Sequence, residues 1–342
     1  ITELNSLYPN SISIDLGAGH VGQTNNTFLR DTFDNIENAT YIGDFDVIIT
    51  GNNSANVIRG GSGDDHNMGG LGDDIIYASI GKDIEDGGEG VDTYIIDADM
   101  NYVPVIDLVK ETAYLQGTEP TSPYDNEVKN FENVTMLGST DVEIIGNDTH
   151  NILIGGSGND TLRTGSGNDQ LFGGLGDDIL IINGTGDSIL DGGEGVDTFK
   201  VDMSHYVPPQ DDPNFTYLTN LSTGFAGSLN NPQHVNNDTL INIENIEYAG
   251  SISAHLYGDE GDNFILGGSG ADRLYGGDGN DILKPWEGDD TVYGEAGDDV
   301  LILKGSGNQS FNGGADNDTL EIDLADWTTM PAGFVGEANL AD

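Results

Sequence analysis

Hydrophobic and polar positions recur along this chain with a period of nine residues. In each nine-residue row, glycines stand near the start, Asp or Asn occupies the sixth place, and an apolar residue usually occupies the eighth. Isoleucine, leucine, valine or an aromatic residue fills 15 of the 18 eighth places, and the exceptions are Asn67, Glu85 and Ser310. One apolar residue kept in register after each glycine-rich turn predicts a short strand per row and a β solenoid.

The rows fall into three arrays. The first holds five rows at 51–95, and the second holds six rows at 146–200 with one extra residue, Asp191, before its last row. The third holds seven rows at 258–321, again with an extra residue, Asn312, before the last row. A flexible Gly/Asp-rich linker has no reason to keep apolar residues in such register, so the arrays are expected to fold.

A longer period surrounds the arrays. The segments "NIEN" at 35–38, "NFEN" at 130–133 and "NIEN" at 242–245 each precede an array, and the glutamate always stands 23 positions before a Gly-Gly pair. Proline-containing stretches between the arrays predict loops with a few short strands. This plan predicts three modules at 1–97, 98–202 and 203–325, followed by a C-terminal tail at 326–342.

Composition favours a cation as the partner. The chain has 51 glycines and 60 acidic against 10 basic residues, a formal charge of −50. Such a chain should repel itself and stay open in metal-free water. Nucleic acid and membrane insertion are not expected, because the basic residues are scattered singly and no stretch approaches the roughly 18 apolar residues of a spanning helix. With no cysteine, neither disulfides nor thiolate sites can form.

The rows carry oxygen ligands suited to calcium. A turn that wraps carbonyls around an ion needs positive φ at several places, which glycine adopts without steric cost. A hard dication takes about six to eight oxygens at about 2.3–2.6 Å, and one sixth-place carboxylate per turn plus carbonyls can supply them. The candidate ligands are Asp65, Asp74, Asp83, Asp92, Asp160, Asp169, Asp178, Asp187, Asp197, Asp272, Asp281, Asp290, Asp299, Asp318, Asn56, Asn151 and Asn263, with the turn glycines Gly61, Gly63, Gly70, Gly72, Gly156, Gly158, Gly174, Gly176, Gly268, Gly270, Gly277 and Gly279.

The nonamer G-G-x-G-x-D-x-U-x, with U aliphatic, resembles the RTX (repeats-in-toxin, haemolysin-type calcium-binding) repeat of secreted bacterial proteins. Rows such as "GGSGNDTLR" at 155–163 and "GGDGNDILK" at 276–284 carry the resemblance. It implies an all-β fold of three tandem calcium-binding parallel β-rolls with flanking strands and proline-containing inserts. In such a roll the six-residue turn holds calcium, the next three residues form a strand, and two rows complete one coil. The resemblance also implies type I secretion of an unfolded chain that folds outside the cell.

The calcium sites are expected to be uneven. One ion between each row and the next but one would give at most about 12 sites and lower the formal charge to about −26. Asn67 and Glu85 stand where an aliphatic is expected, so that sheet should be weak, with Met68 and Ile84 as alternative inward residues. The turn "PWEGDD" at 285–290, and the row whose sixth place is Asn308, are expected to bind calcium loosely or not at all.

Catalysis has little support in the sequence. The chain has no G-x-S-x-G elbow, H-E-x-x-H pair, Walker loop or cysteine nucleophile, and its six histidines show no metal-ligand spacing. Adjacent aspartates in the turns are explained by calcium coordination without acid/base chemistry. We therefore expect a protein without enzymatic activity.

Three functional hypotheses remain open. The first is an extracellular structural or adhesive protein at the bacterial cell surface (surface layer, matrix, filament or adhesin subunit) whose partners are calcium, other copies of itself or surface components. The alternative is the calcium-dependent folding and secretion module of an enzyme or toxin whose catalytic domain is absent. The third is an adhesin whose inserts at 98–128 and 203–240 bind glycans through Tyr102, Tyr114, Tyr124, Tyr206, Phe215 and Tyr217. The lead-in "SISIDLGAG" near the start and "LEIDLADW" near the end are consistent with head-to-tail association or with excision from a longer repeat protein.

Overall fold

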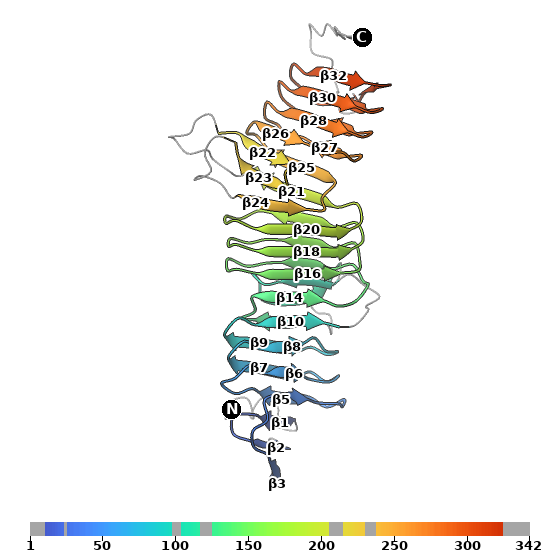
Figure 1. Ribbon diagram of the computed structural model, residues 1–342. Coiled ribbons are helices and arrows are strands. Elements are labelled where there is room, and N and C mark those ends of the chain that lie inside the picture. Colours follow the sequence, from blue (N-terminus) through green and yellow to red (C-terminus); the bar gives the residue numbers. More distant parts are fainter. Residues whose placement is uncertain are drawn as a thin grey trace. The chain divides into compact units, whose positions relative to one another are not determined.

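The computed structural model describes residues 11–23, 26–97, 104–116, 125–204, 215–229 and 237–323. The chain forms two compact units, residues 1–178 and 179–342. Within the described residues the regular structure consists of strands, and no helix is long and apolar enough to cross a membrane. Figure 1 shows the strands of each unit stacked as successive rungs.

Two sheets face each other in unit 1. In one sheet every neighbouring pair of strands is parallel, and the strands lie in chain order. They are β4 (Ala39–Thr40), β6 (Val57–Arg59), β8 (Ile75–Tyr77), β10 (Thr93–Ile96), β14 (Asn133–Met136), β16 (Ile152–Gly156) and β18 (Gln170–Leu175).

The second sheet of unit 1 contains parallel row strands and two antiparallel meanders. The row strands are β5 (Val47–Thr50), β7 (His66–Leu71), β9 (Ile84–Glu89), β15 (Glu143–Ile145) and β17 (Thr161–Arg163). The meanders are β1 (Ile12–Asp15), β2 (His20–Gln23) and β3 (Asn26–Thr32), then β11 (Pro104–Asp107), β12 (Thr112–Leu115) and β13 (Asn126–Lys129).

Unit 2 repeats this plan. Its first sheet is parallel throughout and contains β19 (Ile179–Ile182), β21 (Thr198–Met203), β25 (Asn245–Gly250), β27 (Phe264–Leu266), β29 (Ile282–Lys284), β31 (Val300–Leu303) and β33 (Thr319–Ile322). Its second sheet contains β20 (Ile189–Glu194), the antiparallel meander β24 (Asp238–Ile241), β23 (Phe225–Ser228) and β22 (Tyr217–Asn220), and the parallel strands β26 (Ala254–Tyr257), β28 (Arg273–Asp278), β30 (Thr291–Ala296) and β32 (Ser310–Ala315).

The strand register confirms the parallel β-roll. Ile58 pairs with Ile76 and Leu274 pairs with Val292, so strands 18 residues apart in sequence are neighbours and two rows complete one coil. All four of these eighth-place side chains are 0% exposed. The core is therefore a stack of single side chains, mostly aliphatic, one from each row and enclosed between the two sheets.

Two eighth-place residues in the first array are polar and still face the core. Asn67 and Glu85 are each 0% exposed, whereas Met68 and Ile84 are half-buried. The expectation that Met68 and Ile84 turn inward is therefore wrong. Glu85 pairs in register with Asn67, and the Asn67 amide donates a 3.3 Å hydrogen bond to its carboxyl group. A shift of one residue in the strand pairing would move every side chain of the strand to the opposite face of the sheet. The register set by the neighbouring strands therefore keeps the Asn67–Glu85 pair inside.

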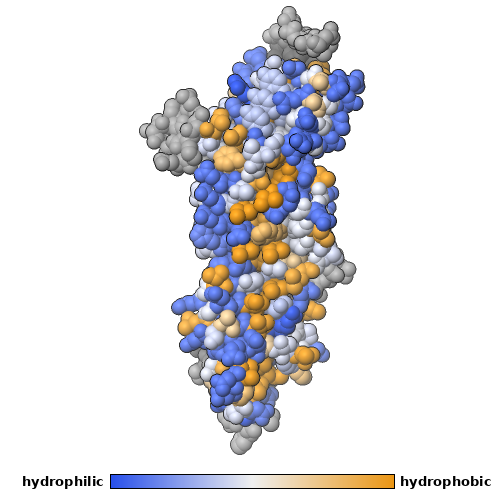
Figure 2. All heavy atoms as spheres, in the orientation of Figure 1, coloured by the Kyte–Doolittle hydropathy of each residue, from blue (hydrophilic) through white to orange (hydrophobic). Residues whose placement is uncertain are grey.

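Strand pairing also connects the arrays within each unit. The meander β11–β12–β13 lies between β9 of the first array and β15, while β10 pairs directly with β14. In unit 2 the meander β22–β23–β24 lies between β20 and β26 in the same manner. The division into three modules at 97 and 202 stays a prediction, and paired strands bridge both of these positions. Figure 2 shows hydrophobic side chains remaining among the hydrophilic atoms of the outer surface.

Candidate metal centres

The sixth-place residues form ladders along the turns. The N–H of Asp65 donates to Asp83 Oδ1 at 2.8 Å, that of Asn56 to Asp74 Oδ1 at 2.7 Å, and that of Asp281 to Asp299 Oδ1 at 2.9 Å. Each bond connects residues 18 positions apart, so it joins successive turns at the same edge of the roll. One oxygen of each carboxylate is thereby fixed by the backbone.

The second carboxylate oxygen faces the inside of the turn. Twelve of the fourteen predicted aspartates are at most 1% exposed, and the exceptions are Asp187 and Asp318. In the described structure, a buried Oδ2 atom accepts no hydrogen bond in Asp65, Asp74, Asp92, Asp160, Asp281 and Asp299. A buried anionic oxygen without a donor is costly, so these turns need a cation or a proton.

The glycines allow the turns to stack in close contact. Gly174 and Gly176 have φ of 119° and 114°, and a Cβ on either would lie 2.1 Å from the carbonyl oxygen of Gly156 or Gly158 in the previous turn. Of the predicted turn glycines, Gly61, Gly70, Gly72, Gly156, Gly174, Gly176, Gly277 and Gly279 have positive φ, while Gly63, Gly158, Gly268 and Gly270 approach backbone atoms closely. The carbonyls of one turn thus lie directly against the next turn.

One turn shows that oxygens converge on a single point. The side-chain nitrogen of Gln309 donates to the carbonyl of Trp286 at 2.7 Å and to Asp290 Oδ2 and the carbonyl of Lys304 at 3.2 Å each. The three acceptors are two turn carbonyls and a sixth-place carboxylate. The Gln309 amide therefore stands where a cation bound to the same oxygens would lie.

Burial makes these carboxylates unusually basic in the metal-free protein. Burial raises the pKa of Asp65, Asp272 and Asp281 to about 7, and that of Asp74 to about 6. Backbone N–H donors oppose the shift but do not cancel it. Asp92, Asp160 and Asp290 likewise reach about 6. A divalent cation would favour the ionised form in every one of these turns.

The donor set fits calcium. Within the described residues, no three His, Asp or Glu side chains converge as ligands of one metal ion. An ion at these turns would therefore draw oxygens from backbone carbonyls as well as from the sixth-place carboxylates. An all-oxygen set rich in carbonyls suits Ca²⁺ and does not suit a metal that prefers nitrogen or sulfur.

The first-row asparagines have protein partners for their amides. Asn56, Asn151 and Asn263 each donate through Nδ2 to the carbonyl of the glutamate in the preceding Asn-x-Glu-Asn segment, at 2.6–2.7 Å. Each Oδ1 accepts the N–H of the residue four positions earlier, at 2.7–2.9 Å. An aspartate could not make the first of these bonds. The predicted ligand role of the three asparagines stays untested, and their geometry is that of a hydrogen-bonded cap.

Two rows differ in phase from the sequence prediction. Ser188 is buried and donates its N–H to Asp238 Oδ1 at 2.8 Å, whereas Asp187 is exposed and accepts the N–H of Asn237. Ser188 therefore takes the sixth place expected for Asp187. Gln309 takes the sixth place expected for Asn308, and Phe311 rather than Ser310 pairs with Val292. The extra residue lies in β19 and in β31, which are four residues long, and not at Asp191 or Asn312.

The Asn-x-Glu-Asn segments hold functional residues that the ligand prediction omitted. Glu132 Oε2 accepts the N–H of Asp92 at 2.8 Å, and Glu244 Oε2 accepts the N–H of Asp197 at 2.7 Å. A glutamate from outside the rows thus takes the next place after Asp92 in one ladder and after Asp197 in another. Its constant spacing of 23 residues to the following Gly-Gly pair was the sequence signal for this role.

The aromatic residues proposed for glycan stacking differ in their surroundings. Phe215 and Tyr217 are 4% and 2% exposed, so their rings pack inside the fold and are closed to a ligand. Tyr114 is half-buried in β12. Tyr102, Tyr124 and Tyr206 lie outside the described residues.

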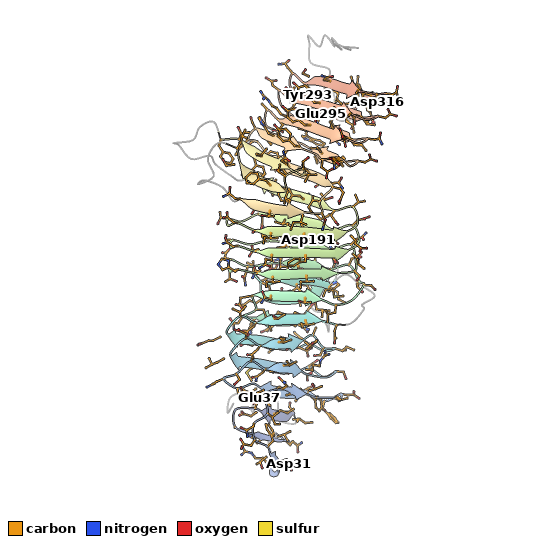
Figure 3. The ribbon with its side chains drawn as sticks, viewed as in Figure 1. Asp31, Glu37, Asp191, Tyr293, Glu295 and Asp316 are labelled. Carbon is orange, nitrogen blue, oxygen red and sulfur yellow. The ribbon has the colours of Figure 1, made fainter. Side chains whose placement is uncertain are left out.

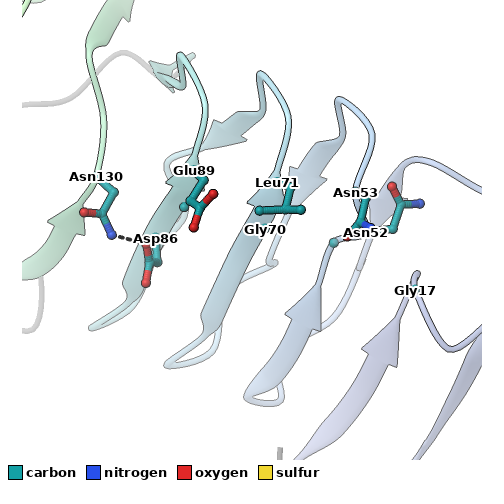
Figure 4. Close-up of a pocket in the computed structure, with 10 residues that line it drawn as sticks. Gly17, Asn52, Asn53, Gly70, Leu71, Asp86, Glu89 and Asn130 are labelled. Carbon is teal, nitrogen blue, oxygen red and sulfur yellow. Dashed lines mark hydrogen bonds between the residues drawn. The ribbon is translucent and has the colours of Figure 1, made fainter.

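A shallow groove runs along the stacked turns of unit 1. Figure 4 shows its lining, in which Asn52, Gly70 and Glu89 come from separate turns and the Asn130 amide donates to Asp86 Oδ1 at 2.7 Å. The groove is open to solvent. It is the outer surface of the turn ladder.

Comparison with known proteins assigns the repeats. No curated protein matches the chain significantly. The family profile described as the RTX calcium-binding nonapeptide repeat matches just over half of the 342 residues, at 43–66, 68–94, 145–180, 184–200, 248–283, 287–303 and 305–321. RTX repeats bind calcium, in agreement with the carboxylate and carbonyl oxygens of the turns. The chain therefore belongs to the family of proteins built from RTX calcium-binding nonapeptide repeats.

Proposed function

We propose that this chain is a non-enzymatic, extracellular, calcium-dependent structural or adhesive protein of a bacterial cell surface that folds on binding calcium after export. The RTX family is typical of secreted bacterial proteins, which supports an extracellular site. The observation that carries the proposal is the ladder of buried carboxylates, in which the described structure gives no hydrogen-bond donor to the Oδ2 atoms of Asp65, Asp74, Asp92, Asp160, Asp281 and Asp299.

Charge makes calcium a condition of folding in this proposal. A chain with a formal charge of −50 resists compaction, and burial of the sixth-place carboxylates adds a desolvation cost. Because the turns exist only in the folded state, calcium binding contributes directly to the free energy of folding. Low cytosolic calcium would keep the chain open for export, and external calcium would close it.

Calcium titration of the chelated protein tests the proposal. We expect calcium to cause a cooperative fall in hydrodynamic radius, while the mass either stays at that of the monomer or rises through assembly. Size-exclusion chromatography with light scattering measures both quantities. Mg²⁺ should cause a weaker response. Asp281→Asn should raise the calcium midpoint, because it removes a buried ligand oxygen. Glu260→Gln makes the same charge change at an exposed turn position and serves as the matched control. A chain that is compact at neutral pH in chelator would contradict the proposal.

A further inference from the structure

The Asn-x-Glu-Asn segments at 130–133 and 242–245 each lie against the last turn of an array. We propose that each of these two segments completes a further calcium site there, together with the turn 87–92 in unit 1 and with the turn 192–197 in unit 2. The inference rests on the proposed function, because the rows must first fold with calcium. It adds two metal sites, here called joints, whose ligands come partly from outside the nine-residue rows.

Two successive turns within an array show how ligand oxygens meet. The point where a Cβ on Gly69 would lie marks the inside of its turn. This point is 2.2 Å from Asp74 Oδ2 in the same turn and 2.4 Å from the carbonyl oxygen of Gly87 in the next turn. A carboxylate and a carbonyl from successive turns therefore face one small space, in which a calcium ion can bind both.

The joint in unit 1 repeats this arrangement with an asparagine in place of the next glycine. The corresponding point at Gly87 is 2.7 Å from Asp92 Oδ2 and 2.3 Å from the carbonyl oxygen of Asn130. Asn130 has a φ of 54°, in the left-handed region that asparagine tolerates. Its amide donates to Asp86 Oδ1 at 2.7 Å, as Figure 4 shows. The backbone conformation and this bond hold the Asn130 carbonyl against the turn.

The joint in unit 2 has the same geometry. The point at Gly192 is 2.5 Å from Asp197 Oδ2 and 2.2 Å from the carbonyl oxygen of Asn242. Asn242 has a φ of 50°, and its amide donates to Asp191 Oδ1 at 2.8 Å. Figure 3 labels Asp191, which lies in β20. Two segments of independent sequence context thus bring a carbonyl to the same place.

A glutamate supplies a second carboxylate at each joint. Glu132 Oε2 accepts the N–H of Asp92 at 2.8 Å, and Glu244 Oε2 accepts that of Asp197 at 2.7 Å, as the next sixth-place aspartate does within an array. Glu132 stands two positions after Asn130, whereas the sixth place of a row stands five positions after the first. The longer side chain of glutamate makes up for the shorter backbone path. Each carboxylate can bind a cation through its other oxygen.

Asp92 lacks a protein donor for the oxygen that faces the joint. Its side chain is 0% exposed, and its Oδ2 accepts no hydrogen bond in the described structure. The Asn130 carbonyl and the Glu132 carboxylate beside it are acceptors as well. Such a group of oxygens, two of them on charged carboxylates, is unfavourable inside a protein unless a cation binds among them.

The other edge of the first array ends differently. The N–H of Asp83 donates to Asn126 Oδ1 at 2.9 Å, and the Ser79 hydroxyl donates to Asp83 Oδ2 at 2.9 Å. The Asn126 side chain also forms a hydrogen bond with the Tyr94 hydroxyl. A neutral amide thus stands where the joint has a glutamate, and protein donors satisfy the aspartate. We infer no further ion at this edge.

An ion at a joint would connect two arrays. The Glu132 side chain faces the array before it, while its backbone carbonyl accepts the Asn151 amide of the array after it at 2.7 Å. Glu244 and Asn263 form the same contact at 2.7 Å. Calcium at the last turn of one array would therefore fix the segment on which the first turn of the next array rests.

Counting bound calcium in the full chain tests the inference. Glu132→Gln and Glu244→Gln each keep a side-chain oxygen that can accept the N–H group, but each loses a charged ligand. At a free calcium concentration that compacts the wild-type protein, each variant should bind about one ion fewer per chain. Equilibrium dialysis with elemental analysis measures this number. The joints lie in separate units, so a variant that fails to fold at one joint leaves the other to decide.

The controls separate ligation from charge. Glu89→Gln and Glu194→Gln remove the same charge from exposed third-place residues of the same two turns, and they should leave the number of ions unchanged. A wild-type ion count in both joint variants, or an equal loss in the controls, would overturn this inference and leave the proposed function standing. A failure of the wild-type protein to compact in calcium would instead contradict the proposed function itself.

Discussion

Asn151 donates a 2.7 Å hydrogen bond from Nδ2 to the backbone carbonyl of Glu132, which joins the first row of an array to the segment that precedes it. Asn151 is 1% exposed, so its side chain is almost completely buried. The same contact occurs at Asn56 and Asn263. An amide is required at this place because the partner is an acceptor. By contrast, the buried Oδ2 atoms of Asp65 and Asp281 accept no hydrogen bond in the described structure.

Asn151→Asp should therefore destabilise the protein. The substitution places two acceptors together, and the expected loss is about 1–3 kcal/mol in the free energy of unfolding at fixed calcium, measured by chemical denaturation. Asn159→Asp is the control, because Asn159 is exposed and its Oδ1 acceptor is kept. If Asn151→Asp instead bound one more calcium ion with stability unchanged, the ligand role predicted from the sequence would be correct.

Gln309→Asp should create a calcium site. The substitution replaces the amide that donates to Trp286, Asp290 and Lys304 with a carboxylate, and calcium can then bridge the same oxygens. We expect about one more bound ion per chain by calorimetry or elemental analysis. Asn308→Asp adds the same charge one residue away at an exposed position, and it should leave the number of ions unchanged. An equal gain in both variants would show that added charge alone, rather than the sixth place, draws the ion.

Acid should compact the calcium-free protein. Burial raises the pKa of Asp65, Asp272 and Asp281 to about 7 in the fold, whereas an aspartate in an unfolded chain titrates near about 3.9. Between these values the folded state binds more protons, so the free energy of unfolding rises as pH falls from about 7 to about 4. Small-angle scattering in chelator should show a smaller radius at pH 4.5 than at pH 7.5.

Calcium-loaded protein should show the opposite trend. Calcium binds the ionised carboxylates. The calcium concentration at which half of the protein is folded should therefore rise as pH falls through 7 and 6. A midpoint independent of pH over this range would mean that the sixth-place carboxylates are not the ligands.

The Asn67–Glu85 pair should limit the stability of the first array. Burial raises the pKa of Glu85 well above its usual value, and the Asn67 amide is its hydrogen-bond partner. Replacing both with leucine restores the aliphatic stack and should raise the free energy of unfolding by about 1–4 kcal/mol at pH 8. Glu85→Leu alone should gain less, because the Asn67 amide loses its partner. Glu89→Leu, at an exposed turn position, should change thermal stability little.

The sequence was sufficient to predict the repeating part of the fold. The nine-residue period was enough to predict the strand in each row and its inward eighth-place residue. A six-residue turn and a three-residue strand fill the row, so the strand has little freedom to start elsewhere. The predicted sixth place was wrong by one residue in two rows, those of Asp187 and Asn308. The runs "ILII" at 179–182 and "VLIL" at 300–303 are aliphatic throughout, so either phase satisfies the hydrophobic pattern. The glycines Gly186 and Gly307 were the signal that could have resolved both rows, because the observed phase puts each at the fourth place, where most rows have a glycine. Their φ angles are 134° and 123°.

The joints between arrays needed the three-dimensional structure. The partner of Glu132 is the N–H of Asp92, 40 residues earlier, and the partner of Glu244 is the N–H of Asp197, 47 residues earlier. The sequence showed that the Asn-x-Glu-Asn segments recur at a constant distance before each array, but not which strand they approach. Pairing across insertions of different length depends on the sheet register, and a local pattern does not encode it.

The N–H groups of Asp65, Asn56 and Asp281 each donate to a carboxylate that lies 18 residues later in the chain, so the ladders have a fixed direction. Along a ladder the donor turn precedes the acceptor turn, so the two faces of a turn differ chemically: one presents an N–H group and the other a carboxylate oxygen.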